Sequence, residues 1–230
     1  YLNSYISYEQ VVLEFQGFPT LELFHQYKQL RMSFRQTISY PLSEEIMLGH
    51  LEKRGQFIGS GEVIAEAILF SAKDLNTGAW PKSGSFPAAK VRSEVAVQAF
   101  QDGKPFDDVL TEYSEYPEMT RGSQASMPQP KRGRFGSQMR NPLRQFLGES
   151  EYTDFLIGNS VADELFFDAE EGAVYGPSEG SLGYYIYRLV SRTAPKTEVD
   201  FKNNERHAFF ITDDHLSVEF LQYIAEVMVR

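Results

Sequence analysis

The sequence contains no cysteine, which excludes disulfides, thiolate nucleophiles and metal sites with cysteine ligands. Histidine is scarce: the four histidines are His25, His50, His207 and His215, and none lies between residues 51 and 206. No apolar run approaches the about 20 residues that a membrane-spanning helix needs. Basic residues are also fewer than acidic residues, with 22 Lys and Arg against 32 Asp and Glu. The net charge of −10 argues against a general nucleic-acid-binding protein, which needs a basic surface.

The length of 230 residues allows a sizeable hydrophobic core in one large or two small domains. Because the chain begins at Tyr1 rather than at Met, we expect a fragment or a mature product, and any membrane anchor would lie outside this fragment. The lack of cysteine is compatible with the cytosol or a periplasm. It favours an extracytoplasmic compartment, where stray thiols are a hazard.

Both ends of the chain carry helical patterns. An apolar stripe recurs at helical spacing over residues 23–34, and Ser43 has the features of an N-cap because two glutamates follow it. Near the other end, Asp213 is expected to cap a last helix with a wide apolar stripe. We predict that residues 1–58 and 199–230 form helical segments that pack on each other.

The middle of the chain mixes strands and helices. Residues 62–70 and 183–190 alternate as strands do, and they place Ala67 and Tyr185 on inward faces. A helix is predicted over residues 88–102, with an apolar face formed by Val91, Val95, Ala96, Ala99 and Phe100. Pro105 is expected to open the next helix. This order predicts an α+β fold with a small sheet.

Three stretches carry a resemblance to a known family. They are GKPFDDVLTEYSE from Gly103, EEGAVYGPSEGSLGYYIYRL from Glu170, and VIAEAILF from Val63. Together they resemble the parvulin (PpiC, rotamase) family of peptidyl-prolyl isomerases, and the helical ends are similar to those of SurA-like and PpiD-like periplasmic foldases. The resemblance implies a parvulin-like domain over residues 62–193, with a small antiparallel sheet, surrounding helices and an insertion near residues 133–160. Either 133–136 or 122–126 matches the family's glycine-rich strand.

The resemblance also implies a site, and this chain departs from it. Active parvulins carry a His on the first strand, a His on the last strand and a Cys or Asp after the second helix. The matching positions here are Ala67, Tyr185 and Tyr116. A Met and a Phe line the family's proline pocket, and Met139 and Phe167 are the candidates here, with ordinary core packing as the alternative for both.

This departure puts isomerase activity in doubt. Isomerisation needs no nucleophile, because the barrier of about 18–20 kcal/mol arises from amide resonance and falls when a twisted amide is bound in an apolar groove with suitable donors. The hydroxyls of Tyr116 and Tyr185 are candidate donors. Since the histidine pair is missing, we expect the activity to be weak or absent, and no cofactor is expected.

Two functions follow as hypotheses. The first is a parvulin-like foldase or chaperone module that binds unfolded or proline-containing polypeptides, with weak or absent isomerase activity, in the periplasm or another extracytoplasmic compartment. The alternative is a structural or assembly subunit that uses a degenerate parvulin fold to hold a fixed protein partner. No nucleic acid is expected as a partner.

Two further patterns have less specific readings. Six basic residues stand between residues 121 and 144, and they indicate either an anion or phosphopeptide site or a solvated basic loop that offsets an acidic body. The run of Asp213, Asp214 and His215 suggests either a metal site or a helix cap, and the cap is favoured because no second ligand cluster has a suitable spacing.

Overall fold

The computed structural model describes residues 7–10, 12, 20–38, 41–74, 85–116, 133–149, 160–196 and 198–228. The elements in chain order are α1 (Tyr8–Gln10), α2 (Leu21–Thr37), α3 (Glu44–Ile58), β1 (Glu62–Ser71), α4 (Ser85–Gln101), α5 (Phe106–Tyr113), β2 (Arg134–Gln138), α6 (Arg140–Phe146), α8 (Val161–Asp163), η2 (Glu164–Asp168, a π-helix), β3 (Val174–Gly180), β4 (Gly183–Thr193) and α9 (Glu205–Met228).

The four strands form one antiparallel sheet in the order β2-β1-β4-β3. The two predicted strands, β1 and β4, are its central pair, with Ala67 opposite Tyr187. No strand was predicted at β3, whose glycines and proline are typical of a turn. Residues Arg134–Gln138 form the strand β2, next to Gly133, whereas residues 122–126 lie outside the described part of the chain, so the choice between 133–136 and 122–126 stays open. The predicted α+β class with a small antiparallel sheet is confirmed.

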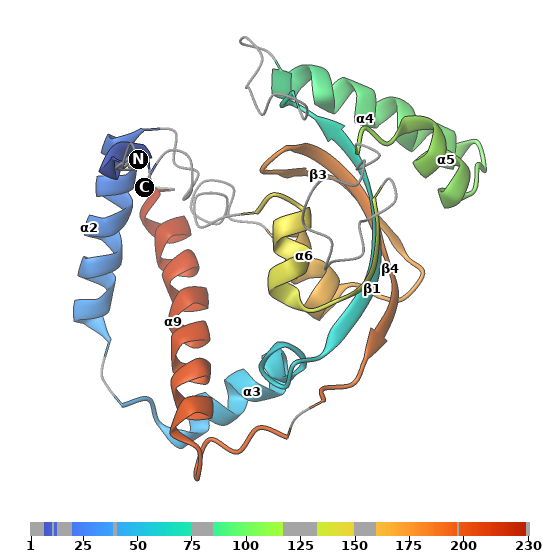
Figure 1. Cartoon of the computed structure of the whole chain (residues 1–230). Helices are drawn as coiled ribbons and strands as arrows, with labels where there is room; N and C mark the ends of the chain where they lie inside the picture. Colours follow the sequence, from blue (N-terminus) through green and yellow to red (C-terminus); the bar gives the residue numbers. More distant parts are fainter. Residues whose placement is uncertain are drawn as a thin grey trace, which may run out of the picture.

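Helices cover both faces of the curved sheet (Figure 1). The concave face holds α6, α8 and η2, and the convex face holds α4 and α5. The alternation of β1 and β4 sends one set of side chains to each face, as predicted. The concave-side core includes Val63, Ala65, Ala67, Leu69, Tyr185, Tyr187 and Leu189, together with apolar residues of α6, α8 and η2.

The predicted helix over residues 88–102 is present as α4, but its predicted buried face is wrong in part. Val91 is 60% exposed and Val95 is 54% exposed. Ala96 and Ala99 are buried as predicted, and the other buried positions are Ala89 and Ser93. Small side chains let the helix backbone approach the sheet closely, so the larger valines lie on the outer face.

Helices α2 and α9, from the two ends of the chain, lie side by side, and α3 meets the N-terminal end of α9 (Figure 1). Aromatic rings connect them: the ring centroids of Tyr27 and Phe220 are 5.6 Å apart. The start of α9 corrects the prediction for Asp213, which lies inside the helix. Asn204 precedes the helix instead, and its side chain accepts hydrogen bonds from the N–H groups of Arg206 and His207. The division into domains over residues 1–58, 62–193 and 199–230 stays a prediction.

None of the helices in the described ranges is long and apolar enough to cross a membrane.

Candidate functional site

Ala67 lies in the middle of the central strand pair, with its side chain in the concave-side core. Its N–H donates to the carbonyl oxygen of Gly133 at 2.9 Å, just before β2 begins. Gly133 has a φ of 92°, and a Cβ there would stand 2.0 Å from the Ala67 oxygen. The close backbone approach beside Ala67 therefore requires glycine.

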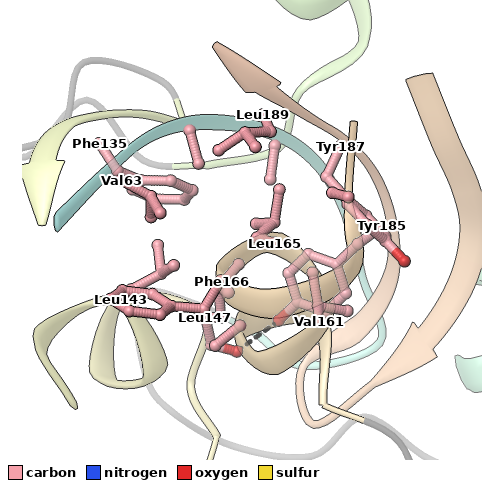
Figure 2. Close-up of a cluster of buried hydrophobic side chains, with 14 of the residues drawn as sticks. Val63, Phe135, Leu143, Leu147, Val161, Leu165, Phe166, Tyr185, Tyr187 and Leu189 are labelled. Carbon is pink, nitrogen blue, oxygen red and sulfur yellow. Dashed lines mark hydrogen bonds between the residues drawn. The ribbon is translucent and has the colours of Figure 1, made fainter. Parts of the chain in front are cut away.

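Tyr185 lies in the same core as Ala67, opposite Leu69 of β1, and it is 1% exposed. Its hydroxyl donates to the carbonyl oxygen of Leu147 at 2.7 Å, the contact drawn as a dashed line in Figure 2. Burial raises the pKa of Tyr185, so the phenol stays neutral and acts as a donor. Its one hydroxyl proton is used in this hydrogen bond to the end of α6.

Tyr116 also donates a hydrogen bond to the C-terminal end of α6. Its hydroxyl donates to the carbonyl oxygen of Phe146 at 3.3 Å, and its ring meets that of Phe135 edge-on with centroids 5.5 Å apart. Burial also raises the pKa of Tyr116. Ser181, in the turn between β3 and β4, adds a third bond by donating to the Leu147 oxygen at 3.1 Å. Three hydroxyls thus satisfy carbonyls that the end of a helix leaves without partners.

Glu149 is a buried carboxylate in this region that was not predicted from the sequence. Its side chain is 2% exposed, and it accepts hydrogen bonds from the Ser160 hydroxyl at 2.7 Å and from the Ala162 N–H at 3.1 Å. Burial raises the pKa of Glu149 to about 7, although Ser160, Ala162 and the Arg144 guanidinium at 3.7 Å favour the charged form. No local pattern marks this residue, because its partners come from the next helix.

The two candidates for the proline pocket are not brought together. Met139 precedes α6 and is 47% exposed. Phe167 lies in η2 and packs against the core that holds Ala67 and Tyr185. Its ring also lies 3.9 Å from the Arg54 guanidinium and lines a cleft of about 590 Å³ formed with α3 and α9. The residues lining that cleft do not include Ala67, Tyr116, Met139 or Tyr185. Ala67, Tyr116 and Tyr185 therefore form one buried cluster, and Phe167 connects that cluster to a separate cleft.

The basic residues between 121 and 144 are paired where the structure describes them. Arg134 donates to Glu66 and Asp107, Arg140 donates to Asp163, and Arg144 lies 3.7 Å from Glu149. Arg121, Lys131 and Arg132 are outside the described residues. These pairs tie elements of the fold together, as expected of structural ion pairs.

Asp214 is engaged in hydrogen bonds within the protein. Its carboxylate meets His50 Nε2 at 2.8 Å and accepts from Arg54 Nε at 2.5 Å. In the described ranges no group of three or more histidines and carboxylates is arranged to hold a metal ion.

The comparisons with known proteins return solved structures only. No family model matches the chain, and no curated protein matches it. A crystal structure of a PpiC-type peptidyl-prolyl cis-trans isomerase domain is 17% identical with a TM-score of 0.39, and the match covers 60% of this chain and 96% of that one. The peptidylprolyl isomerase PrsA from Bacillus cereus is 17% identical with a TM-score of 0.36, covering 95% of this chain and 66% of that one. PrsA from Bacillus subtilis is 16% identical with a TM-score of 0.33, covering 93% and 70%.

These likenesses concern the fold alone. The isomerase domain matches a part of the chain, whereas the two PrsA chains match nearly all of it and extend beyond it.

Proposed function

We propose that this chain is a parvulin-like foldase or chaperone module that binds extended, proline-containing segments of other polypeptides and has weak or no isomerase activity. The motifs from Gly103, Glu170 and Val63 support the class. The lack of cysteine supports an extracytoplasmic place of action, which is part of the same proposal.

We expect low isomerase activity because the hydroxyls of Tyr116 and Tyr185 already donate hydrogen bonds within the protein. A catalytic donor must point to where the twisted amide of the substrate lies. The buried hydroxyl of Tyr185 donates to the carbonyl of Leu147 instead, and the hydroxyl of the half-buried Tyr116 donates to that of Phe146. Ala67 has no polar group at all. The three positions that carry polar side chains in active parvulins thus offer a substrate no free donor.

An isomerase assay tests this proposal. We expect the parent chain not to accelerate cis/trans exchange of a proline peptide, measured without a coupled protease by the fluorescence change of the peptide. An Ala67→His, Tyr185→His double variant is expected to gain measurable activity, because it restores an imidazole pair on β1 and β4. Strong activity of the parent would refute the inference from the missing histidines.

The double variant places two polar rings in a tightly packed core, so its folding is checked by circular dichroism and urea unfolding. The single Tyr185→His variant is the second test, since Ala67 is then unchanged. The parent assay decides the main question whether or not either variant folds.

Binding is tested separately from catalysis. We expect reduced, carboxymethylated lactalbumin, a permanently unfolded chain, to bind with a saturable rise in fluorescence anisotropy, and native lactalbumin not to bind. A parent chain that binds neither form would refute the chaperone function.

The alternative function, a structural or assembly subunit, has support from the outer face of α4. Val91 and Val95 stand one helical turn apart, and both are more than half exposed. A Val95→Glu variant that abolishes capture of one fixed partner, while the unfolded chain still binds, would favour this function.

A further inference from the structure

Two histidine rings meet where α3 packs against α9. The ring centroids of His50 on α3 and His215 on α9 are 5.2 Å apart, and the two rings are nearly perpendicular. His50 is 7% exposed and His215 is half-buried. Both rings belong to the contact that joins the N-terminal helical segment to the C-terminal one (Figure 1). A change of charge at either ring would therefore act on the packing of these two helices.

The His50 ring is fixed by Asp214, the residue before His215 in α9. Burial opposes the charge of Asp214, but the bonds from His50 and Arg54 lower its pKa to about 2. The carboxylate is therefore ionised near neutral pH and can only accept hydrogen bonds. The Nε2 atom of His50, 2.8 Å from this carboxylate, must carry a proton. His50 thus presents a fixed orientation to the ring of His215.

The charged and titratable groups that face His215 come from three elements. They are His50, Lys53 and Arg54 of α3, Asp168 of η2, and Asp214 and Glu219 of α9. Asp168 and Glu219 are exposed, so water screens their attraction for a charge on His215. Burial lowers the pKa of His215 and the nearby His50 lowers it further, whereas Glu219 and Asp214 act in the opposite direction.

Protonation of His215 is coupled to the contact between the two helices. The neutral rings meet edge to face, which is a favourable arrangement for aromatic side chains. A positive charge on His215 loses part of its hydration in this half-buried place and stands beside the His50 ring. Separating α9 from α3 would restore the hydration and remove the neighbouring ring. The contribution of neutral His215 is therefore present above its ordinary pKa of 6.5 and is lost as the pH falls below 6.5.

We propose that the contact between His50 and His215 is a pH-sensitive joint, which holds α9 against α3 at neutral pH and loosens when His215 gains a proton in mildly acidic solution. The bonds from His50 and Arg54 to Asp214 persist, because that carboxylate stays charged. The joint therefore loosens without breaking. It is a regulatory device of the fold and does not depend on the proposed function.

Imidazole NMR measures the uptake of the proton at His215. We expect the ring signals of His215 in the parent to titrate with a pKa below 6.5. In His50→Gln this pKa should rise, because the neighbouring ring is gone, while the glutamine amide can still donate to Asp214. A parent pKa of 6.5 or higher would refute the joint. An unchanged pKa in His50→Gln would also refute it, since His50 would then have no effect on His215.

Spin labels measure the separation of the two helices. Because the chain has no cysteine, Glu52→Cys on α3 and Ser217→Cys on α9 give two unique labelling sites, and both positions are exposed. We expect the distance between the labels to be longer and more broadly distributed at about pH 5.5 than at about pH 7.5. Adding His215→Gln to the labelled chain should make the distances equal at the two pH values.

His25→Gln is the matched control for the removal of a histidine. His25 is exposed on α2 and stacks on Tyr8, so its loss should leave the pH response of the labelled chain unchanged. Glu149 also titrates near neutral pH, but its partners lie in α6 and at the start of α8. Its effect is the same in all the compared chains and cancels between them.

The label distances decide the question even if His50→Gln does not fold. Equal distances at the two pH values in the parent would refute the joint. A pH response that persists in His215→Gln would assign the response to another group and would refute it as well. Neither result bears on the proposed function, which depends on the isomerase assay and on the binding of carboxymethylated lactalbumin.

Discussion

A tyrosine and a histidine at the same strand position engage different neighbours. The Tyr185 phenol reaches across the core to the carbonyl of Leu147, a span that the shorter imidazole ring does not cover. Its proton is one of two that the Leu147 oxygen, a helix-end acceptor, receives, since Ser181 donates the other. The Tyr185 hydroxyl thus gives the end of α6 an anchor.

Removing the Tyr185 hydroxyl should reveal the strength of this anchor. Tyr185→Phe keeps the ring but loses the 2.7 Å bond, and the Leu147 oxygen retains only Ser181. We expect the free energy of unfolding in urea to fall by about 1 kcal/mol. Tyr184→Phe is the control, since that hydroxyl bonds Glu179 at an exposed site, and it should cost less than about 0.5 kcal/mol. Equal losses in the two variants would contradict a special role for the Tyr185 bond.

Glu149 should make stability depend on pH near neutrality. Its pKa in the folded chain is raised to about 7 from 4.5, so the folded state binds more protons between these values than the unfolded state does. The contribution of Glu149 to stability is therefore favourable at low pH and is lost as the pH rises from 4.5 through 7. The full shift corresponds to about 3 kcal/mol.

The measurement compares parent and Glu149→Gln in urea at a series of pH values. Glutamine keeps an oxygen for the Ala162 N–H and does not titrate, so the difference between the two chains should change in favour of the variant as the pH rises. Groups that both chains share, such as His215, cancel in that difference. The exposed Glu52→Gln variant is the control. A pH-independent difference would show that Glu149 has the same pKa in the folded and the unfolded chain, which would contradict the raised pKa.

At the scale of elements, Gly133 controls where β2 begins. Gly133→Ala would place a Cβ 2.0 Å from the Ala67 oxygen at a φ of 92°, and neither backbone can yield without breaking the bond between them. We expect a loss of about 2–4 kcal/mol in the free energy of unfolding.

Gly136→Ala is the matched control within β2. Its φ is also positive, at 34°, but a Cβ there meets nothing within 4 Å. Backbone strain alone should cost about 1 kcal/mol. If the two variants lose the same stability, the contact with Ala67 contributes nothing.

The sequence predicted those elements whose signals are local. The alternation in β1 and β4, the Ser43 cap and the stripe of α2 all depend on neighbouring residues, and all are present. The strand β3 was missed because its glycines and proline resemble a turn. The buried face of α4 was misjudged because side-chain size, rather than hydrophobicity, decides how closely a helix approaches a sheet.

The site was predictable only in part. The positions Ala67, Tyr116 and Tyr185 were implied by the resemblance to parvulins, and the structure places them in or against one core cluster. Glu149 and the cleft beside Phe167 depend on contacts between distant segments, which spacing within one segment cannot reveal. Whether Met139 and Phe167 bind a substrate remains a prediction.

At the scale of the whole molecule, a chain of charges joins the helical ends to the sheet region. Asp214 of α9 binds His50 and Arg54 of α3, and Arg54 reaches Asp163, which also accepts two bonds from Arg140 of α6. Burial alone would raise the pKa of Asp214, but the bonds from His50 and Arg54 outweigh it and lower the pKa to about 2. The carboxylate therefore stays charged at all pH values at which proteins normally work.

Cutting this chain at Asp214 should loosen α9 from the rest of the molecule. Asp214→Asn leaves the Arg54 guanidinium with the 3.4 Å contact to Asp163 and removes the charged partner of His50. Because breaking a buried ion pair leaves a charge uncompensated, we expect a loss of about 2–4 kcal/mol. Amide hydrogen exchange should accelerate in α9 and α3 more than in β1 and β4, if the helical ends form a unit of their own as predicted.

The exposed neighbour Asp213→Asn should change neither the free energy of unfolding nor the hydrogen exchange. Uniform acceleration across β1, β4 and α9 would mean that the helical ends and the sheet unfold together, and would contradict the predicted division of the chain.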